Sequence, residues 1–241
     1  MSVSNLVSLF FPEFKSYYWS ERKAREYGIS QAELLEEWDA KGAQSREVGT
    51  FMHQQIRNYY HGLPFVNKYR FTYKGKYKHI DTEVSLESEF EQFICFLNDH
   101  KFKPFRTEWT IFDEDLKIAG TIDVIHKKNG TFDLYDWKRS HRLLDESGDI
   151  RKTNPFQYGI HGLERIPDTV YWHYCLQLNI YRYILERNYD MTVDKMYLIL
   201  LHSEAIEYRK IVVPRMDEYV GIILNAFRDG SVYRWKSAAD F

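Results

Sequence analysis

The spacing of hydrophobic and polar residues divides the chain into a mainly helical first part, residues 1–100, and a second part in which strands alternate with helices. Apolar residues that recur every three or four positions are typical of amphipathic helices, whereas alternation at every second position is typical of half-buried strands. On this basis, we predict helices in the first part over residues 14–27, 30–41, 46–60 and 85–98. Residues 68–79 are polar and aromatic without a clear period, which predicts a loop or a ribbon.

The second part, residues 101–241, begins with three strands in succession and then returns to helices and further strands. We predict strands over residues 104–112, 117–127, 131–139, 194–202 and 206–213, and helices over 169–188 and 215–228. Residues 141–167 form a long charged loop, and structureless loops of that length are uncommon in compact domains and often functional. This order predicts an α/β (α+β) fold, with a central mixed β-sheet that contains a three-stranded meander and is flanked by helices.

Length and composition narrow the class of protein without naming a function. A chain of 241 residues suits one domain, and no apolar run is long enough to cross a membrane. The N-terminal stretch SNLVSLFF is too short and lacks the basic residues of a secretion signal. Two cysteines, Cys95 and Cys175, predict buried structural thiols in a reducing compartment, cytoplasmic or nucleoid-associated.

The net charge of −2 does not indicate a nucleic-acid-binding protein, but it averages over local basic clusters. Each cluster taken alone is more typical of a solvated face than of a binding site. The clusters occur at residues 70–78, 127–128, 138–142 and 151–152.

The dipeptide Asn129-Gly130 lies between two strand-like segments and is a strong hairpin signal, because a type I′ turn needs a positive φ at both central residues. If these two residues form the whole loop, Lys128 pairs with Thr131. Counting back along both strands then places Asp123 directly opposite Asp136. Like charges that face each other across a sheet are destabilising, so this pair calls for a compensating cation.

Side chains alternate along a strand, so Lys138 shares a face with Asp136, and Trp137 points to the other side. Two carboxylates and one ammonium group on one face indicate a divalent metal site, because magnesium prefers oxygen ligands. The backbone carbonyl of Trp137 is a further candidate ligand. The alternative is a surface hairpin with ordinary salt bridges, which would be the better interpretation of the D-x-K triplet alone.

Glu108 on the preceding strand is a candidate ligand whose face depends on the length of the turn at 113–115. A two-residue loop of Glu114-Asp115 pairs Glu108 with Thr121, on the face of Asp123. A three-residue loop pairs it with Gly120, on the opposite face, and a β-bulge can alter either count.

Three polar residues of predicted helices complete the candidates. His53 alone is more typical of an ordinary helical histidine, although an imidazole beside carboxylates would favour manganese. Gln177 and Tyr181 lie four residues apart on one helical face, with His173 one turn earlier. They could hold a base or a phosphate, or they could simply form the polar edge of an amphipathic helix.

These residues together resemble a known pattern. The order G-x-x-D, then hydrophobic-D-W-K, then a helix with Q-x-x-x-Y is similar to the RecB-like branch of the PD-(D/E)XK nuclease superfamily. The upstream W-x10-G-T-x-x-H, from Trp38 to His53, resembles the N-terminal motif of the same branch. The resemblance spans residues 38–185. It departs from the pattern in that Asp123 follows Thr-Ile rather than Pro, and the cysteine quartet of the iron–sulfur relatives is absent.

The resemblance implies a restriction-endonuclease-like core and a nuclease that uses Mg²⁺ or Mn²⁺ to hydrolyse DNA. It implies that Asp123 and Asp136 bind the metal, that Glu108 and His53 support the metal site, and that Lys138 is catalytic. It also implies that Gln177 and Tyr181 help to form the active site and hold DNA. We add Lys127, Lys128 and Arg139 as candidate contacts to the DNA backbone.

Our interpretation of the sequence is therefore a metal-dependent DNA exonuclease that prefers single-stranded ends and serves in recombination, replication or repair. An endonuclease of the same class remains an alternative, because these motifs do not separate the two. A catalytically silent nucleic-acid-binding module of the same fold is a second alternative. A third is an unrelated α+β enzyme with a chance D-x-K. We also expect that Lys138→Ala abolishes cleavage and leaves the fold and metal binding largely intact.

Overall fold

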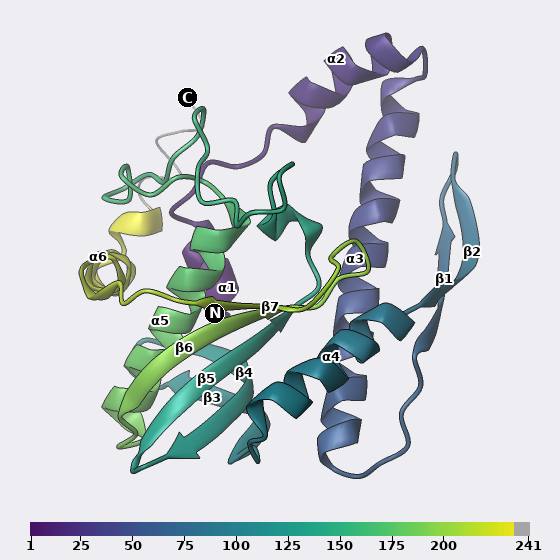
Figure 1. The fold of residues 1–241 in the computed structure, drawn as a ribbon. Helices are drawn as coiled ribbons and strands as arrows, with labels where there is room; N and C mark the ends of the chain where they lie inside the picture. Colours follow the sequence, from purple (N-terminus) through teal and green to yellow (C-terminus); the bar gives the residue numbers. More distant parts are fainter. Residues whose placement is uncertain (234–241) are drawn as a thin grey trace. The chain divides into compact units, whose positions relative to one another are not determined.

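The structure is a computed structural model in which residues 1–233 are described (Figure 1). The chain divides into two compact units. Unit 1 comprises Met1–Pro12 and Cys95–Phe241, and unit 2 comprises Glu13–Ile94. Whether the two units form a single nuclease domain, as the sequence suggests, stays a prediction.

Unit 1 is built on a five-stranded sheet in the order β3-β4-β5-β6-β7. Neighbouring strands are antiparallel except β5 and β6, which are parallel, so the sheet is mixed. This confirms the predicted α/β class and the three-stranded meander. The strands are β3 (Arg106–Asp113), β4 (Ile118–Lys128), β5 (Thr131–Lys138), β6 (Val193–Leu200) and β7 (Arg209–Val212).

The hairpin between β4 and β5 has the predicted two-residue turn. Lys128 pairs with Thr131, and Asn129 and Gly130 have φ values of 50° and 87°. The register continues to the pair Val124 and Tyr135, which is one step short of Asp123 and Asp136. The predicted pairing of the two strands is therefore confirmed as far as this last pair.

The turn between β3 and β4 differs from both lengths that we considered. Asp113 pairs with Ile118, so the loop has four residues, 114–117. The reason lies in its local contacts: the Asp113 carboxylate accepts a hydrogen bond from the Leu116 backbone N–H at 2.9 Å, and the Leu116 side chain turns into the core. The flanking pairs Thr107–Val124 and Trp109–Ile122 consequently place Glu108 opposite Asp123, and neither predicted partner, Thr121 or Gly120, is correct.

Helix α5 (Val170–Asn188) packs against β3 and β6 and runs along one face of the sheet (Figure 1). The side chain of Thr169 caps its N-terminus by accepting from the Trp172 N–H. Two further helices contact α5, namely α6 (Asp217–Arg228) and the short α1 (Val3–Ser8), which the sequence analysis did not predict. The predicted loop after β5 contains one short 3-10 helix, His141–Leu143.

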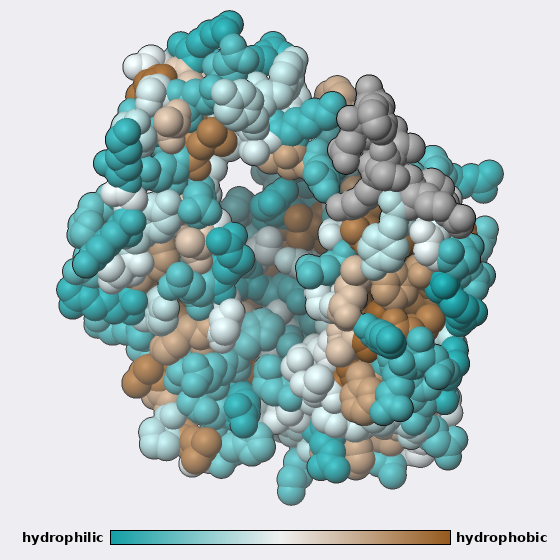
Figure 2. All heavy atoms as spheres, turned by 180° about the vertical axis from the view of Figure 1, so that it is seen from behind, coloured by the Kyte–Doolittle hydropathy of each residue, from teal (hydrophilic) through white to brown (hydrophobic). Residues whose placement is uncertain are grey.

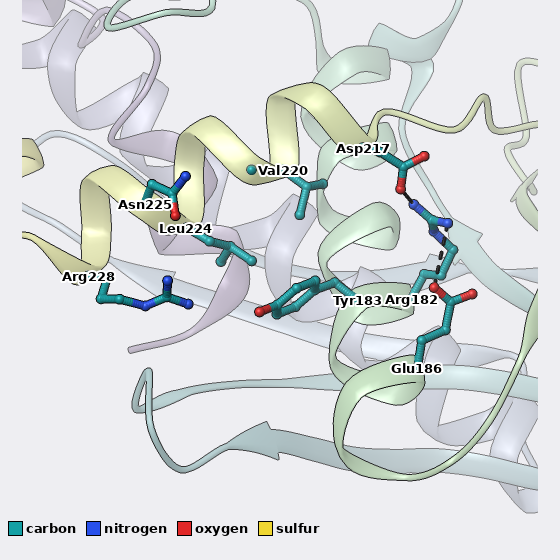
Figure 3. A pocket seen from close by; sticks show the side chains of 9 residues that line it. Arg182, Tyr183, Glu186, Asp217, Val220, Leu224, Asn225 and Arg228 are labelled. Carbon is teal, nitrogen blue, oxygen red and sulfur yellow. Dashed lines mark hydrogen bonds and ion pairs between the residues drawn. The ribbon is translucent and has the colours of Figure 1, made fainter.

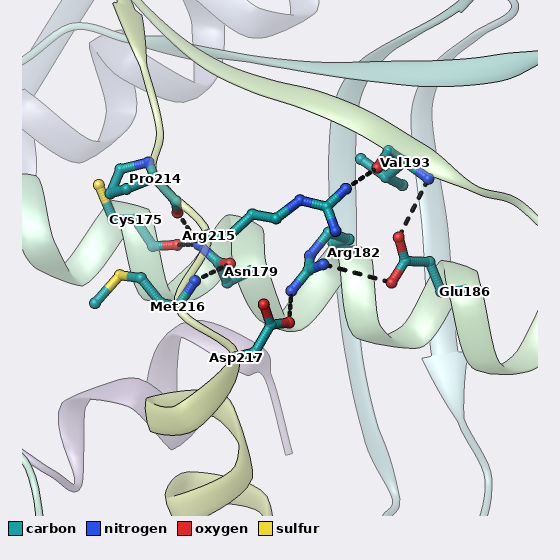
Figure 4. A network of polar contacts seen from close by, with 9 residues as sticks. All are labelled: Cys175, Asn179, Arg182, Glu186, Val193, Pro214, Arg215, Met216 and Asp217. Carbon is teal, nitrogen blue, oxygen red and sulfur yellow. Dashed lines mark hydrogen bonds and ion pairs between the residues drawn. The ribbon is translucent and has the colours of Figure 1, made fainter.

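A buried polar network holds the segment that leads into α6 against α5 (Figure 4). The side-chain amide of Asn179 donates to the carbonyls of Cys175 and Pro214, and its oxygen accepts from the Met216 N–H. Arg182, also in α5, forms ion pairs with Glu186 and Asp217. These contacts fix the position of α5, the helix that carries Gln177 and Tyr181.

Unit 2 contains α2 (Ser16–Tyr27), α3 (Gln31–Tyr60) and a two-stranded antiparallel ribbon of β1 (Lys68–Lys74) and β2 (His79–Ser85). The two helices predicted over 30–41 and 46–60 are wrong as separate elements, because no proline interrupts the segment between them and α3 is continuous. Ser30 caps α3 by accepting from the Glu33 N–H at 3.1 Å. Helix α4 (Glu87–His100) begins in unit 2 and ends in unit 1.

Hydrophilic residues predominate over much of the face shown in Figure 2, with hydrophobic side chains interspersed among them. Cys175 is buried as predicted, but Cys95 is exposed, because the buried stripe of α4 follows Phe90, Phe93 and Phe96 instead. Among residues 1–233, we find no helix that has both the length and the apolar character needed to cross a membrane.

Candidate active site

Strand β5 directs two charged side chains to one face of the sheet and a large aromatic one to the other. Trp137 is buried against Phe96, with ring centroids 5.2 Å apart. On the α5 side, the Lys138 ammonium group forms an ion pair with the Asp136 carboxylate and lies 4.4 Å from the centre of the Tyr174 ring. Asp136 is only 2% exposed, so this is a buried ion pair.

The neighbouring strands bring two more carboxylates to the same region of the sheet. Asp123 is 6% exposed, and its Oδ2 accepts a hydrogen bond from the Trp137 backbone N–H at 2.7 Å. This bond ties β4 to β5 at the position where the regular pairing ends. Glu108 on β3 is half-buried and has a φ of 46°, an uncommon conformation for a residue other than glycine. The ligand oxygens of Glu108 and Asp123 lie within 4.8 Å of each other.

The electrostatics of this group depend on Lys138. Burial alone would lower the pKa of Lys138, but Asp136, and then Asp123 and Tyr174, raise it, and the net effect is a raised pKa. Lys138 is therefore an ammonium ion at neutral pH. Its charge offsets part of the repulsion between the two buried aspartates, which would otherwise be costly in the protein interior.

Helix α5 places two tyrosine side chains and one glutamine side chain over this part of the sheet. Tyr174, Gln177 and Tyr181 are three and four residues apart, so they lie on one helical face. The Gln177 amide donates to the Tyr181 hydroxyl at 2.7 Å. Burial, with smaller contributions from Asp136 and Asp123, raises the pKa of Tyr181 to about 12, although Gln177 and Lys138 oppose the rise. Our sequence analysis missed Tyr174, although its spacing from Gln177 and Tyr181 was a usable signal.

Gly120, the glycine of the G-x-x-D motif, is where Tyr181 approaches the sheet. A Cβ atom at residue 120 would overlap the Tyr181 ring and would lie 2.8 Å from its hydroxyl oxygen. Glycine at this position therefore allows the Q-x-x-x-Y helix to pack closely on β4, beside the strand segment that carries Asp123.

We accordingly expect Gly120→Ala to destabilise the protein by about 1–3 kcal/mol, the usual cost of overpacking a core. The matched control is Gly221→Ala in α6, where a Cβ meets nothing within 4 Å. That variant should gain up to about 1 kcal/mol from helix propensity. Urea denaturation of both variants tests the contact, and equal stability of Gly120→Ala and wild type would contradict it.

The remaining predicted residues do not all lie in this cluster. Lys127 is four residues from Asp123 along β4, a separation of about 13 Å at the usual rise of a strand, and Lys128 is one residue further. Both are exposed. His173 is hydrogen-bonded to Asp168 at 2.8 Å and stacks on Phe11 rather than joining Gln177. Arg139 follows Lys138 directly and is half-buried. His53 lies in α3 of unit 2, and its role as a metal ligand stays a prediction.

A separate cavity of about 220 Å³ lies between α5 and α6 (Figure 3). Arg182 faces it between Glu186 and Asp217, and these three charges are paired with one another. Asp123, Asp136 and Glu108 are not among its lining residues. We therefore assign the candidate site to the sheet, not to this cavity. The lining residues are Arg182, Tyr183, Glu186, Asp217, Val220, Gly221, Leu224, Asn225 and Arg228.

The donor set of the sheet suits a divalent cation. Asp123, Asp136 and Glu108 supply only carboxylate oxygens, which are the ligands that Mg²⁺ and Mn²⁺ prefer. Two of these groups are almost fully buried, and the ligand oxygens of Asp123 and Glu108 are close enough together to share one ion. The residues present therefore fit a bound divalent metal.

The class of protein follows from the comparison with protein families. The family model of the PD-(D/E)XK nuclease superfamily matches residues 21–229. The chain belongs to this superfamily, whose members are nucleases that use divalent metals. The assignment to the RecB-like branch stays a prediction.

Two solved structures are similar to the chain at low sequence identity. One is the crystal structure of SSO0001, which is 14% identical with a TM-score of 0.36, and the match covers 94% of this chain and 74% of that one. The other is a protein from Eubacterium rectale that is provisionally described as an exonuclease. It is 14% identical with a TM-score of 0.39, and the match covers 62% of this chain and 53% of that one. A search of curated proteins finds no significant match.

Proposed function

We propose that the protein is a divalent-metal-dependent DNA exonuclease of the PD-(D/E)XK superfamily that acts at single-stranded ends. The observation that carries this proposal is the buried group formed by Asp123, Asp136 and Lys138, with Glu108 beside Asp123. A buried cluster of this kind is costly for stability alone, and such clusters are typical of functional sites.

In the proposed site, Asp123, Asp136 and Glu108 hold the metal, with His53 and the Trp137 carbonyl as further candidate ligands. A bound Mg²⁺ or Mn²⁺ ion would act as a Lewis acid that polarises the scissile phosphate and lowers the pKa of water. The carboxylates would hold the ion in one place, because Asp123 is held by the Trp137 N–H and Asp136 by Lys138.

Lys138 contributes a positive charge at a fixed place. Its ion pair with Asp136 and its contact with the Tyr174 ring restrict the ammonium group to the carboxylate cluster. There it can donate a hydrogen bond to the attacking water or to a phosphate oxygen, and it stabilises the charge that develops on the phosphate. The neighbouring carboxylates raise the pKa of Lys138 and so favour its charged form.

The residues of α5 are the proposed contacts to the substrate next to the cleaved bond. The Gln177–Tyr181 pair is oriented by its own hydrogen bond, so the hydroxyl is held near both aspartates. Arg139 is proposed to contact the neighbouring phosphate. Lys127 and Lys128, which lie further along β4, would contact phosphates more distant from the cleaved one. Roles in recombination, replication or repair remain part of this proposal.

The proposal is tested with end-labelled single-stranded DNA in linear form and with the same DNA sealed into a circle. An exonuclease needs an end, so we expect loss of the linear strand and survival of the circle in Mg²⁺ or Mn²⁺, with neither lost in EDTA. Loss of both forms would show that the protein is an endonuclease rather than an exonuclease. A stable gel shift without loss of either form would favour a binding module and contradict hydrolysis.

A further inference from the structure

The ribbon of unit 2 ends in a strongly basic tip, defined here as residues Lys74–His79. The tip contains three lysines and a histidine and no acidic residue. Lys74, Lys76 and His79 are exposed, and Lys78 is half-buried. We propose that this tip is a second nucleic-acid contact, which binds the phosphate backbone and a base of a DNA strand without taking part in hydrolysis. The proposal rests on the proposed function for its choice of ligand.

The backbone of the tip is held in one conformation by a single carboxylate. Glu36 of α3 accepts hydrogen bonds from three consecutive N–H groups, those of Lys76, Tyr77 and Lys78, at 3.1, 2.8 and 2.6 Å. The Gly75 N–H also donates to the Lys78 carbonyl at 2.8 Å. A Cβ atom at residue 75 would collide with the Glu36 carboxylate, so glycine is required for this clamp. Because the backbone of the loop is already ordered, less conformational entropy is lost when its lysines bind a ligand.

The cations of the tip have fewer acidic partners than the cations in the rest of the ribbon. Arg70 forms two hydrogen bonds with Asp81, and Lys68 forms an ion pair with Glu83. Within residues 1–233, by contrast, Lys74 and Lys76 have no acidic partner within ion-pair distance, and Lys78 has only Glu37 at 3.9 Å. The Glu36 carboxylate is already engaged by the backbone. The ammonium groups of Lys74 and Lys76 are therefore available to an anionic ligand.

An aromatic ring accompanies these charges. Tyr77 is 45% exposed, and the Lys76 ammonium group lies 5.1 Å from the centre of its ring. Exposed aromatic rings beside cations are the usual means of holding a single strand, because a base stacks on the ring while the cations contact phosphates. This combination favours a nucleic-acid strand over an acidic protein surface, for which a stacking ring would add little.

The test measures binding rather than cleavage. Fluorescence anisotropy of a labelled single strand of about 20 nucleotides, and of a duplex of the same length, is recorded in EDTA from about 50 to about 200 mM salt. The triple variant Lys74→Ala/Lys76→Ala/Lys78→Ala should bind the single strand at least about tenfold more weakly. The slope of the logarithm of the binding constant against the logarithm of the salt concentration should be shallower by about 2. The reason is that each neutralised phosphate contributes about 0.7 to this slope for a single strand.

The matched control removes the same net charge from cations that already have acidic partners. We expect its affinity and its salt dependence to stay close to those of the wild type, because its charges are offset locally. The control variant is Lys23→Ala/Arg25→Ala/Lys68→Ala, whose partners are Glu26, Glu21 and Glu83.

A second variant keeps every cation and removes the clamp. Glu36→Ala should speed hydrogen exchange of the Lys76, Tyr77 and Lys78 amides, which lose their acceptor, and should also weaken binding of the single strand. Faster exchange with unchanged affinity would show that the clamp does not serve binding and would overturn that part of the proposal.

The outcomes separate this inference from the proposed function. If the wild type cleaves DNA but the triple variant binds like the control, the tip is not a DNA contact and the proposed function stands. If the tip variants lose binding while the wild type cleaves nothing, the tip is supported and the hydrolytic function fails. Equal loss of duplex and single-strand binding would retain the phosphate contacts but overturn the preference for a single strand.

Discussion

Replacing Lys138 by methionine should lower the rate of DNA cleavage by about a hundredfold to a thousandfold, the usual effect of removing one charged donor from a hydrolytic site. Methionine has a similar length and fills the space under Tyr174, so the loss reports the ammonium charge rather than a cavity. Single-turnover cleavage in Mg²⁺ measures the effect. Lys195→Met is the control, because Lys195 is an exposed lysine of the neighbouring strand β6.

The same variant should also lose stability when no metal is present. Asp136 is buried and would lose its ion-pair partner, and breaking a buried ion pair typically costs about 3–5 kcal/mol. The structure thus changes our expectation from the sequence that the loss of Lys138 leaves the fold largely intact. Mg²⁺ should recover more stability in Lys138→Met than in the wild type, as measured by urea denaturation. A variant that cleaves DNA at the wild-type rate would remove Lys138 from the mechanism.

The second large effect is expected for Asp123→Asn. The asparagine oxygen can still accept from the Trp137 N–H, so the tie between β4 and β5 is kept while the charge is lost. In the wild type, a metal at about a hundred times its Kd should add about 2.7 kcal/mol of stability. We expect Asp123→Asn to retain less than about 1 kcal/mol of this gain and to lose cleavage by at least a hundredfold.

The control for this experiment is Asp115→Asn, because Asp115 lies in the exposed turn between β3 and β4. It should behave as the wild type in both measurements. Thermal unfolding followed with and without Mg²⁺ or Mn²⁺ provides the stabilities. If the metal stabilises Asp123→Asn as much as the wild type, then Asp123 is not a ligand, and the placement of the metal at this part of the sheet is wrong.

The sequence predicted best where a short signal determines the backbone. Asn129 and Gly130 tolerate the positive φ that a two-residue hairpin needs, so the register of β4 and β5 followed directly. The alternation of side chains then placed Asp136 and Lys138 on one face and Trp137 on the other, as observed. The order of the elements similarly predicted the mixed sheet and its class.

The sequence did not predict the features that depend on tertiary contacts. The four-residue turn before β4 depends on a hydrogen bond from the Leu116 N–H to Asp113 and on burial of the Leu116 side chain. No turn motif in the sequence predicts either contact. The position of Tyr174 over Lys138 depends on how α5 is set against the sheet. In unit 2, the clamp of Glu36 on the ribbon joins residues about 40 positions apart, so the basic segment 70–78 could not be distinguished from a solvated face.

The most direct test of the central claim compares two isosteric substitutions in one strand. Asp136→Asn changes the proposed site, and Asp133→Asn changes another buried aspartate of β5, one that accepts a hydrogen bond from the Lys195 N–H. Cleavage of labelled linear single-stranded DNA is followed for both variants and the wild type in Mg²⁺, Mn²⁺ and EDTA. Our account predicts metal-dependent cleavage by the wild type and Asp133→Asn and none by Asp136→Asn. Cleavage that persists in Asp136→Asn, or that continues in EDTA, would contradict it.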